Sequence, residues 1–309
     1  MVDCIKDKLD KVETIHFHSN NYSAFLSHED LLTFLPNLKT LHNKRACSIQ
    51  DKWLHNHYPK LERLMLNNPE EILTDTVGIF FDKNPQLQSF QTDHRFLLKN
   101  SDTFLKSNMK LDVLSIRYEL DDGLNGVCSL LSKLYDNGFY KRLEFDSGAS
   151  KIPQDGINRI GRLGGLEKWS GCFEGITVIP AVANLKKLRI CDASLTKIDL
   201  DAMIDSFPNL HQVRLYEASN NKLLPFIRRL PKLSELSVRH FFAENGHEID
   251  LPTLNGARKQ LSKPSKLTIY VEENVYLGTK MATKNLYVDH NLIEVKRVGN
   301  IQEDFFADR

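Results

Sequence analysis

Seven basic residues recur at positions from which they could together bind an anion. Each lies between the apolar residues of a short segment with the pattern of a β-strand, and they are Arg117, Arg142, Lys168, Lys187, Arg189, Arg214 and Arg239. Side chains alternate between the two faces of a strand, so residues between the apolar ones share the outer face. Guanidinium and ammonium groups bind carboxylates and phosphates through charge-assisted hydrogen bonds. The pattern therefore predicts a surface for an acidic or phosphorylated segment of a partner protein.

The remaining side chains expected on this surface are few and mixed. Tyr216 completes the set of candidate partner-binding residues, and the acids among them are Glu144, Asp146 and Glu235. An alternative interpretation is a solvated face whose charges prevent aggregation. Nucleic acid is a disfavoured ligand, because 41 basic residues are balanced by 40 acidic ones and no aromatic residues are interleaved with the bases.

Motifs for catalysis, cofactors or metals are not recognisable. His16 and His18 share one face of a strand, but two histidines are too few ligands for a stable zinc site. The glycines of residues 161–165 lack the Lys-Ser/Thr of a phosphate-binding loop, and we interpret them as a turn. The sequence contains no Gly-x-Ser-x-Gly and no His-Glu-x-x-His. We therefore expect a binding protein without a cofactor or metal, and not an enzyme.

The elements that must position the basic residues repeat along the chain. The clearest repeat is Phe207-Pro208-Asn209-Leu210-His211-Gln212-Val213-Arg214-Leu215, with a proline break followed by a strand whose first, fourth and sixth places are apolar. The first apolar residue of each copy falls at positions 12, 38, 61, 87, 111, 140, 166, 185, 210 and 233. The period of about 25 residues lies within the range of leucine-rich repeats. Further strands are expected at 267–271 and, as an edge strand, at 292–298.

A helical segment follows most of these strands. Asn68-Pro69-Glu70-Glu71 has the residue types of a helix start, as has Ser48-Ile49-Gln50-Asp51. Leu124, Val127, Leu131 and Leu134 form an apolar stripe that Asn137-Gly138 ends. Between residues 166 and 185 the repeat is shorter, and an extended or 3₁₀ segment is expected there. Strand and helix cannot bury their apolar faces alone, so repeats must stack.

The expected fold is an α/β leucine-rich-repeat solenoid, a horseshoe with a parallel concave sheet and helices on the convex side. Residues 12–271 would form the repeat domain, with about ten to eleven repeats. Residues 1–11 would be an N-terminal cap or the remnant of a missing segment. We expect residues 272–301 to be a C-terminal cap and residues 302–309 to be an acidic tail.

Composition indicates an intracellular protein. The N-terminal residues lack the apolar run of a signal peptide, and no window reaches eighteen consecutive apolar residues, so no membrane association is expected. The five cysteines are odd in number and contain no Cys-x-x-Cys, which favours a reducing compartment, the cytoplasm or the nucleus. Cys128 lies on an apolar helix face and is expected to be buried.

The strand motif Phe/Leu-Pro-Asn/Lys-Leu-x-x-Leu-x-Leu, with a helix in each repeat, resembles the F-box/leucine-rich-repeat proteins of the ribonuclease-inhibitor-like class over about residues 12–270. The resemblance implies the substrate-recognition part of an SCF-type ubiquitin ligase, with the target on the concave face. No F-box precedes the repeats in this sequence, so an SCF adaptor is an expected partner only if an F-box lies upstream. The alternative is a standalone scaffold or inhibitor protein.

Overall fold

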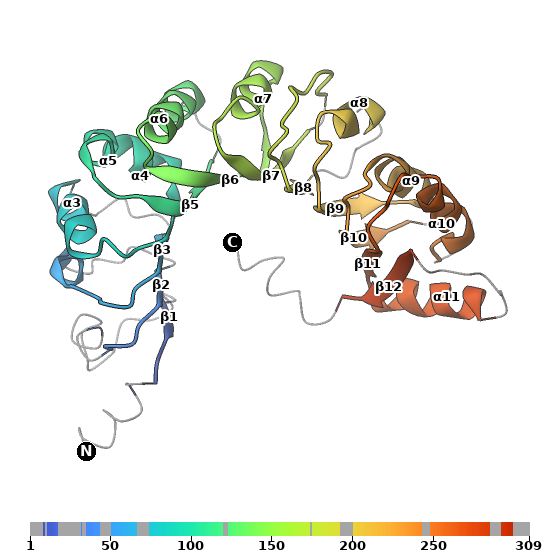
Figure 1. Ribbon diagram of the computed structural model, residues 1–309, viewed down its shortest axis with the longest axis horizontal. Coiled ribbons are helices and arrows are strands. Elements are labelled where there is room, and N and C mark those ends of the chain that lie inside the picture. The colour runs from blue at the N-terminus through green and yellow to red at the C-terminus, as the bar shows by residue number, and fades with distance from the viewer. Residues whose placement is uncertain are drawn as a thin grey trace. The chain divides into compact units, whose positions relative to one another are not determined.

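A computed structural model of the chain describes residues 9, 11–17, 32, 35–43, 51–66, 74–119, 123–173, 175–191, 200–242, 248–284 and 292–298. The chain divides into two compact units. Unit 1 comprises Met1–Asp146 and Leu163–Gly165, and unit 2 comprises Ser147–Arg162 and Leu166–Arg309. Both units repeat one arrangement, in which a strand is followed by a connection that usually contains a helix (Figure 1).

The strands of the described residues form one sheet of twelve, in the order in which they occur in the sequence. Neighbouring strands within each unit pair in parallel. The strands are β1 (Thr14–Phe17), β2 (Thr40–Asn43), β3 (Arg63–Leu66), β4 (Ser89–Asp93), β5 (Leu111–Arg117), β6 (Tyr140–Lys151), β7 (Leu166–Cys172), β8 (Lys187–Ile190), β9 (Gln212–Ala218), β10 (Glu235–Phe241), β11 (Leu267–Val271) and β12 (Ile293–Arg297). Each strand predicted from the apolar spacing is confirmed, including β12 at the edge of the sheet.

The helices lie on one face of the sheet in each unit (Figure 1). They are η1 (Asp51–His55, a 3₁₀ helix), α3 (Thr74–Lys83), α4 (His94–Lys99), α5 (Ser101–Lys106), α6 (Leu124–Asp136), α7 (Gln154–Ile160), α8 (Leu200–Asp205), α9 (Asn220–Arg229), α10 (Leu251–Lys259) and α11 (Glu273–Thr283). Parallel strands in sequence order, each recurring after about 25 residues with helices on one face, define an α/β leucine-rich-repeat solenoid.

The core of unit 1 lies between its strands and helices and is rich in aromatic rings. Phe81 of α3 contacts Phe90 of β4 and Phe104 of α5, with ring centroids 5.4 and 5.7 Å apart. Three of the four residues of the predicted stripe on α6, Val127, Leu131 and Leu134, are fully buried, whereas Leu124 in the first turn is half-buried. Cys128 is buried beside them, as expected. The helix ends at Asp136 with Asn137 as its C-cap, and Gly138 follows with φ of 72°, a left-handed conformation that glycine adopts without strain.

In the core of unit 2, each repeat contributes one residue to a buried row across the strands. Trp169 of β7, Leu188 of β8 and Val213 of β9 are neighbours in register, and each is at most 1% exposed. Trp169 occupies the place of a strand leucine in its repeat, and its ring contacts those of Phe173 and Phe207, with centroids 5.1 and 6.3 Å away. The large indole thereby fills the space that a shorter repeat would leave.

The shortened repeat lacks a helix in its described residues, 173 and 175–186, as its spacing predicted. This extended segment is tied to α7 by Gln154, whose Oε1 accepts hydrogen bonds from the backbone N–H groups of Thr177 (3.0 Å) and Val178 (3.2 Å). At Gly161, a Cβ atom would collide with the ring of Pro180, so the two segments approach closely only because the residue is glycine. Direct polar contacts thus replace the helix in this repeat.

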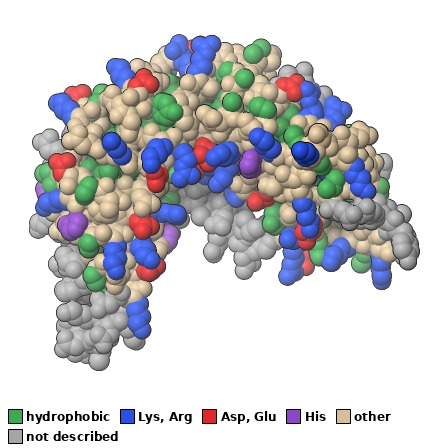
Figure 2. Space-filling view, viewed as in Figure 1, with side chains coloured by type: hydrophobic (Ala, Val, Ile, Leu, Met, Phe, Trp, Pro, Cys, Tyr) green, Lys and Arg blue, Asp and Glu red, His purple; other side chains and the backbone are tan. Residues whose placement is uncertain are grey.

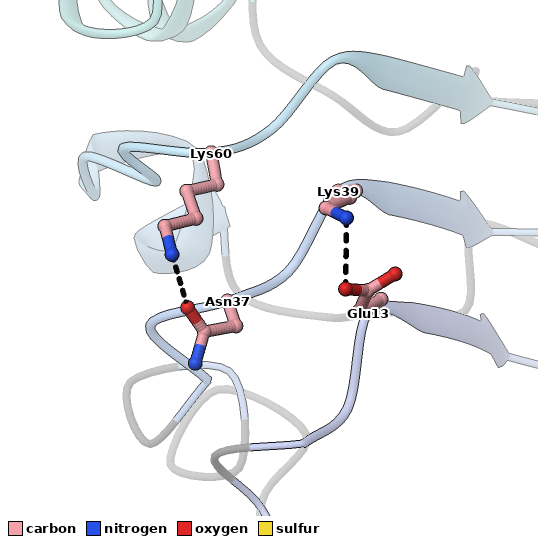
Figure 3. Close-up of polar contacts among 4 residues, drawn as sticks. All are labelled: Glu13, Asn37, Lys39 and Lys60. Carbon is pink, nitrogen blue, oxygen red and sulfur yellow. Dashed lines mark hydrogen bonds and ion pairs between the residues drawn. The ribbon is translucent and has the colours of Figure 1, made fainter.

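Polar contacts at the starts of the strands join successive repeats (Figure 3). Lys39 Nζ lies 2.8 Å from Glu13 Oε1, and Lys60 Nζ donates a hydrogen bond of 2.6 Å to Asn37 Oδ1. Asn37 and Lys60 occupy the Asn/Lys position of the strand motif in consecutive repeats. The same pairing recurs in unit 2, where Lys232 Nζ donates to Asn209 Oδ1 at 2.6 Å. In both units, therefore, the side chains at the Asn/Lys position of the motif form a hydrogen bond between neighbouring repeats.

Arg258 of α10 is buried completely and joins three backbone segments of unit 2. Its guanidinium donates to the carbonyl oxygens of Leu230 (2.7 Å), Leu233 (2.6 Å) and Ser265 (2.9 Å), among others. Leu230 is the C-cap of α9, where the last carbonyls of a helix lack partners within the helix. Burial lowers the pKa of Arg258 to about 10, so the side chain is still charged at neutral pH.

Several sequence expectations lie outside the described residues. These are the helix starts at 48–50 and 68–71, most of the segment 1–11, and the tail 302–309. The stretch expected as a C-terminal cap contains α11 and β12, and β12 extends the parallel sheet by pairing with β11. Among the helices of the described residues, none has both the length and the apolar character needed to cross a membrane.

Candidate anion-binding surface

Three neighbouring strands of unit 2 carry the basic residues closest to one another. Lys168 of β7 lies in register with Lys187 of β8, and Arg189 of β8 lies in register with Arg214 of β9. Adjacent strands are about 4.8 Å apart, so each pair places two positive charges side by side. We call these four residues the basic face. Figure 2 shows Lys and Arg side chains gathered over the strands in the middle of the view.

Strand alternation turns the basic face away from the core. In β8, Leu188 and Ile190 are buried while Lys187 is exposed and Arg189 is half-buried between them. Lys168 and Arg214 are half-buried on their own strands. The four cations therefore lie on the face of the sheet opposite the helices, as the sequence predicted. Half-burial of a guanidinium strengthens its interaction with an anion, because less water competes for the charge.

Hydroxyl side chains flank the two arginines in the same cross-strand row. Ser170 of β7 pairs in register with Arg189, and Ser237 of β10 pairs in register with Arg214. The row thus reads serine, arginine, arginine, serine over β7 to β10. Both serines are almost completely buried, and Ser170 Oγ lies 3.6 Å from Cys191 Sγ. Between β7 and β10, positive charge in this row is confined to β8 and β9.

An aromatic and basic cluster lies one step further along β9 and β10. The guanidinium of Arg239 lies 5.1 Å from the ring centroid of Tyr216, and the ring of His240 contacts Tyr216 from the edge at 5.2 Å. His240 Nδ1 is 3.0 Å from a carboxylate oxygen of Glu272. Tyr216 is 37% exposed, so its ring is one of the larger apolar surfaces available beside the basic face. Sequence reasoning identified Tyr216 and Arg239 but not His240 or Glu272, which no repeat position distinguishes.

The acid on the neighbouring strand is held by another side chain. Glu235 of β10 follows Gln212 of β9 in the row that begins with Lys168 and Lys187. Gln212 Nε2 donates a hydrogen bond of 2.5 Å to Glu235 Oε1. Glutamine therefore separates this carboxylate from Lys187 by one strand. Counting residues in the sequence placed Glu235 on the surface but did not show this separation.

At the starts of the strands, by contrast, neighbouring repeats carry opposite charges. Lys186 Nζ lies 3.4 Å from Glu167 Oε1 in unit 2, one residue before the pair Lys168 and Lys187. In unit 1, Lys141 Nζ lies 2.7 Å from Asp112 Oδ1. The hydrogen bond and the charge of Lys141 hold the pKa of Asp112 below its usual value. In unit 2, a pair of opposite charges, Lys186 with Glu167, thus lies directly beside the pair of like charges, Lys187 with Lys168.

The two basic residues predicted for unit 1 have different surroundings. Arg117 of β5 lies in register between Asp93 of β4 and Asp146 of β6, so opposite charges alternate across these strands. Asp93 Oδ1 also accepts a hydrogen bond from Phe96 N at the start of α4. Arg142 lies opposite Val113 and is exposed. Arg117 therefore has the position of a structural ion-pair partner, and Arg142 lies beside an apolar residue of β5.

A histidine pair occurs at the start of the sheet. His16 Nδ1 and His42 Nδ1 are 3.0 Å apart on β1 and β2, and the two residues are in register. His18, the second histidine of the sequence analysis, lies outside the described residues. Within the part of the chain that the structure describes, no three His, Cys, Asp or Glu side chains come together as a metal site. His42 was missed in the sequence, although it follows His16 by 26 residues, one repeat period.

Comparisons with known proteins identify no family for this chain. No protein-family profile matches it, and no curated protein matches it. Eleven chains of solved structures match, one of them in the "Crystal structure of TLR13-ssRNA13 complex". That match has 17% sequence identity and a TM-score of 0.39, and it covers 78% of this chain and 37% of the other, so this chain spans just over a third of that neighbour's length. A likeness at this level carries no argument about the ligand.

Proposed function

We propose that the protein is a binding module that holds an acidic segment of another protein against the basic face. The observation that carries this proposal is the register of two like-charged pairs, Lys168 with Lys187 and Arg189 with Arg214, on three adjacent strands. Like charges directly opposite each other destabilise a sheet, whereas opposite charges contribute about 0.2–1 kcal/mol. Stability alone therefore does not explain this arrangement.

The adjacent row shows that the chain can place complementary charges where cross-strand pairs form. Lys186 with Glu167 is such a pair, and the two residues come directly before Lys187 and Lys168 in the chain. The opposite-charge pair Lys186 with Glu167 and the like-charge pair Lys187 with Lys168 are only one residue apart along the chain. This part of the sheet can therefore hold acidic side chains, and yet the row of Lys168 and Lys187 places two bases next to each other. An acidic ligand would neutralise the like charges and relieve their repulsion on binding. This supports an anion as the ligand of the face.

A solvated face without a ligand and a nucleic-acid site are the competing functions. Surface charge that only prevents aggregation does not require like charges to pair in register. Single-stranded nucleic acid is usually held by a charged groove together with stacking aromatic rings. Tyr216 is the one exposed aromatic side chain found beside the basic face among the described residues, and its ring already contacts Arg239 and His240. An acidic protein segment fits these observations better.

The test measures binding of a fluorescein-labelled pool of random-sequence acidic peptides by fluorescence anisotropy. A pool in which Asn and Gln replace Asp and Glu gives the background. We expect the double variant Arg189→Glu/Arg214→Glu to bind the acidic pool at least about tenfold more weakly, since each charge-assisted hydrogen bond contributes about 1.5–3 kcal/mol. The matched control is Lys186→Glu/Lys232→Glu, which makes the same change of charge at the strand starts of unit 2.

The outcomes separate the competing functions. Weakened binding in the first variant but not in the control supports the basic face as the site. Equal losses in both variants would show a response to net charge only and would overturn the proposal, as would equal binding of the acidic and amide pools. A single-stranded oligonucleotide that bound more tightly than the acidic peptides would favour nucleic acid instead. Thermal unfolding followed by circular dichroism verifies that each variant is folded.

The role in a ubiquitin ligase stays a prediction from the family resemblance. A recognition subunit would use such a face to hold its target, and a standalone scaffold or inhibitor would use it in the same way. The two differ in whether an SCF adaptor binds the same polypeptide. Co-purification of the adaptor with the product of the complete gene distinguishes them, and its absence would leave the scaffold or inhibitor function.

A further inference from the structure

We infer that the basic face recognises a phosphorylated serine or threonine, with the phosphate bound between Arg189 and Arg214. This inference rests on the proposed function and makes it more specific. The centre of the site is the row in which Ser170, Arg189, Arg214 and Ser237 follow one another across β7 to β10. Three strand spacings make this row about 14 Å wide, with the two guanidiniums in its middle.

The number of charges in the row favours a phosphate over a carboxylate. A phosphomonoester carries a charge of about −1.5 to −2 at neutral pH and three acceptor oxygens, whereas a carboxylate carries one charge and two oxygens. Each guanidinium presents five N–H donors in a planar fork that matches such oxygens in pairs. One phosphate can therefore interact with Arg189 and Arg214 at the same time, whereas a single carboxylate has less charge and fewer oxygens to share between them.

The flanking serines limit the positive charge to one short stretch. Ser170 and Ser237 carry hydroxyl groups and no charge, so the row offers two adjacent cations and not a continuous stripe. A polyanion with a charge on every residue or nucleotide would need cations along its whole length. Two adjacent guanidiniums with neutral neighbours fit a single, doubly charged group better.

A second pair of cations predicts an acid beside the phosphorylated residue. Lys168 and Lys187 lie two residues before Ser170 and Arg189 on the same strands, a displacement of about 6.6 Å. Two residues of an extended peptide span the same distance. An Asp or Glu two positions from the phosphorylated residue would therefore reach Lys187 while the phosphate contacts Arg189. We expect a preference for this acid on one side of the phosphorylated residue only.

The experiment compares fluorescein-labelled peptide pools that differ only at the central residue, which is phosphoserine, glutamate or serine. Anisotropy titrations should show the phosphoserine pool binding at least about tenfold more tightly than the glutamate pool, and the serine pool binding weakest. A further set fixes aspartate two positions before or after the phosphoserine. One of these two placements should increase affinity about threefold to tenfold.

Uncharged variants assign each contact to its cation. Arg214→Gln should reduce the ratio of phosphoserine to glutamate binding to near one, because one guanidinium then remains. Lys187→Gln should keep that ratio and remove the preference for the neighbouring aspartate. Lys186→Gln, one residue away and paired with Glu167, is the matched control and should change neither quantity.

Lowering the pH gives an independent readout. The second phosphate pKa is about 6, so between about pH 7.5 and pH 5.5 the ligand loses most of its second charge. Binding of the phosphoserine pool should weaken severalfold over this range, and binding of the glutamate pool should not, since a glutamate carboxylate stays ionised. A general change in the charge of the protein would affect the binding of both pools, so it would not produce a pH dependence that is specific to the phosphoserine pool.

Failure of this inference is distinguishable from failure of the proposed function. Equal binding of the phosphoserine and glutamate pools would overturn the phosphate assignment while leaving an acidic-segment site. Absence of binding by both pools would remove the phosphate assignment and the proposed function together. Tight binding of an unphosphorylated single-stranded oligonucleotide, with a loss in Arg214→Gln, would assign the face to phosphodiesters instead and overturn the inference.

Discussion

The buried guanidinium of Arg258 provides a stringent test of how unit 2 is held together. Arg258→Met keeps a long, flexible, apolar side chain at this position on α10 and removes every donor. The variant leaves the carbonyl oxygens of Leu230, Leu233 and Ser265 without the partner they have in the wild type. Because only one side of each hydrogen bond is removed, the change differs from replacing a whole buried polar group with apolar residues, which is often nearly neutral.

Two contributions of opposite sign determine how much Arg258→Met changes the free energy of unfolding. Each hydrogen bond to a charged donor contributes about 1.5–3 kcal/mol, and three such bonds are 2.9 Å or shorter. Against this, the wild type bears the cost of burying a charge, which is visible in the lowered pKa of Arg258 and which the methionine variant avoids. We expect a net loss of about 2–4 kcal/mol in the free energy of unfolding, at the high end for one substitution.

The assay is equilibrium denaturation in urea, combined with hydrogen exchange of the amides in α9 and at the start of β10. Exchange should accelerate most in these segments, because the carbonyls that lose their donor lie at the junction of α9 and β10. Arg258→Lys retains the charge but supplies one nitrogen in place of the planar fork, so an intermediate loss is expected. Lys259→Met, at an exposed neighbouring position, should stay within about 0.5 kcal/mol of the wild type. If Arg258→Met matched the wild type in midpoint and slope, the guanidinium would not stabilise this junction and the reasoning would fail.

Two further predictions concern Leu188 in the buried row of unit 2 and the ion pair between Lys141 and Asp112 in unit 1. Leu188→Ala should lower the free energy of unfolding by about 2–5 kcal/mol in urea titrations, because the side chain is buried between Trp169 and Val213; a loss below about 0.5 kcal/mol would contradict the assignment of this strand. Lys141→Ala should raise the pKa of Asp112 towards its usual value in an NMR titration, since the lysine lowers it in the wild type. A carboxyl group whose pKa is lowered in the folded state stabilises that state above the unfolded pKa, and this effect is lost as the pH falls through the folded pKa. The difference in stability between wild type and variant should therefore begin to shrink below about pH 4 and disappear at lower pH. An unchanged Asp112 pKa would show that the ion pair does not persist in solution.

The strands could be predicted because their apolar spacing reports burial directly. Leu61, Leu64 and Leu66 were placed at the first, fourth and sixth positions of a repeat, and all three are at most 3% exposed. Alternate side chains along a strand point into the core, so these positions must be apolar, and a pattern with this spacing can be recognised in the sequence. The helix α6 was equally predictable, because its apolar stripe and its glycine stop are both local features.

Pairing across strands was less accessible, since it depends on how repeats align. Arg117 was grouped with the other bases because it lies between apolar residues, but Asp93 and Asp146 are its neighbours in register. Each of these three residues is six positions after the first apolar residue of its repeat, so the repeat position contained the signal. Position within the repeat predicts neighbours on the sheet, whereas the strand pattern alone predicts only the face.

Arg258 had no detectable signal in the sequence. A basic residue near the end of an amphipathic helix is ordinarily solvent-exposed and interacts with the helix C-terminus. Its actual partners belong to other segments, the turn after α9 and the loop before β11. The arrangement requires the carbonyls of residues 230–233 and 265 to converge around one point, which is a property of the stacked repeats and not of α10.

Fixed register also explains how a solenoid of ordinary composition can concentrate charge. Each repeat position becomes a row across the sheet, so one basic residue at the same position of two neighbouring repeats is enough to create a paired cation site. The row of Arg189 and Arg214 arises in this way, with serine at the same position on either side. Repulsion within such a row can be offset by complementary pairs such as Lys186 with Glu167, where Lys186 lies three residues before Arg189. Favourable cross-strand pairs contribute about 0.2–1 kcal/mol each. A chain with almost no net charge can therefore place two cations side by side at one point of its sheet.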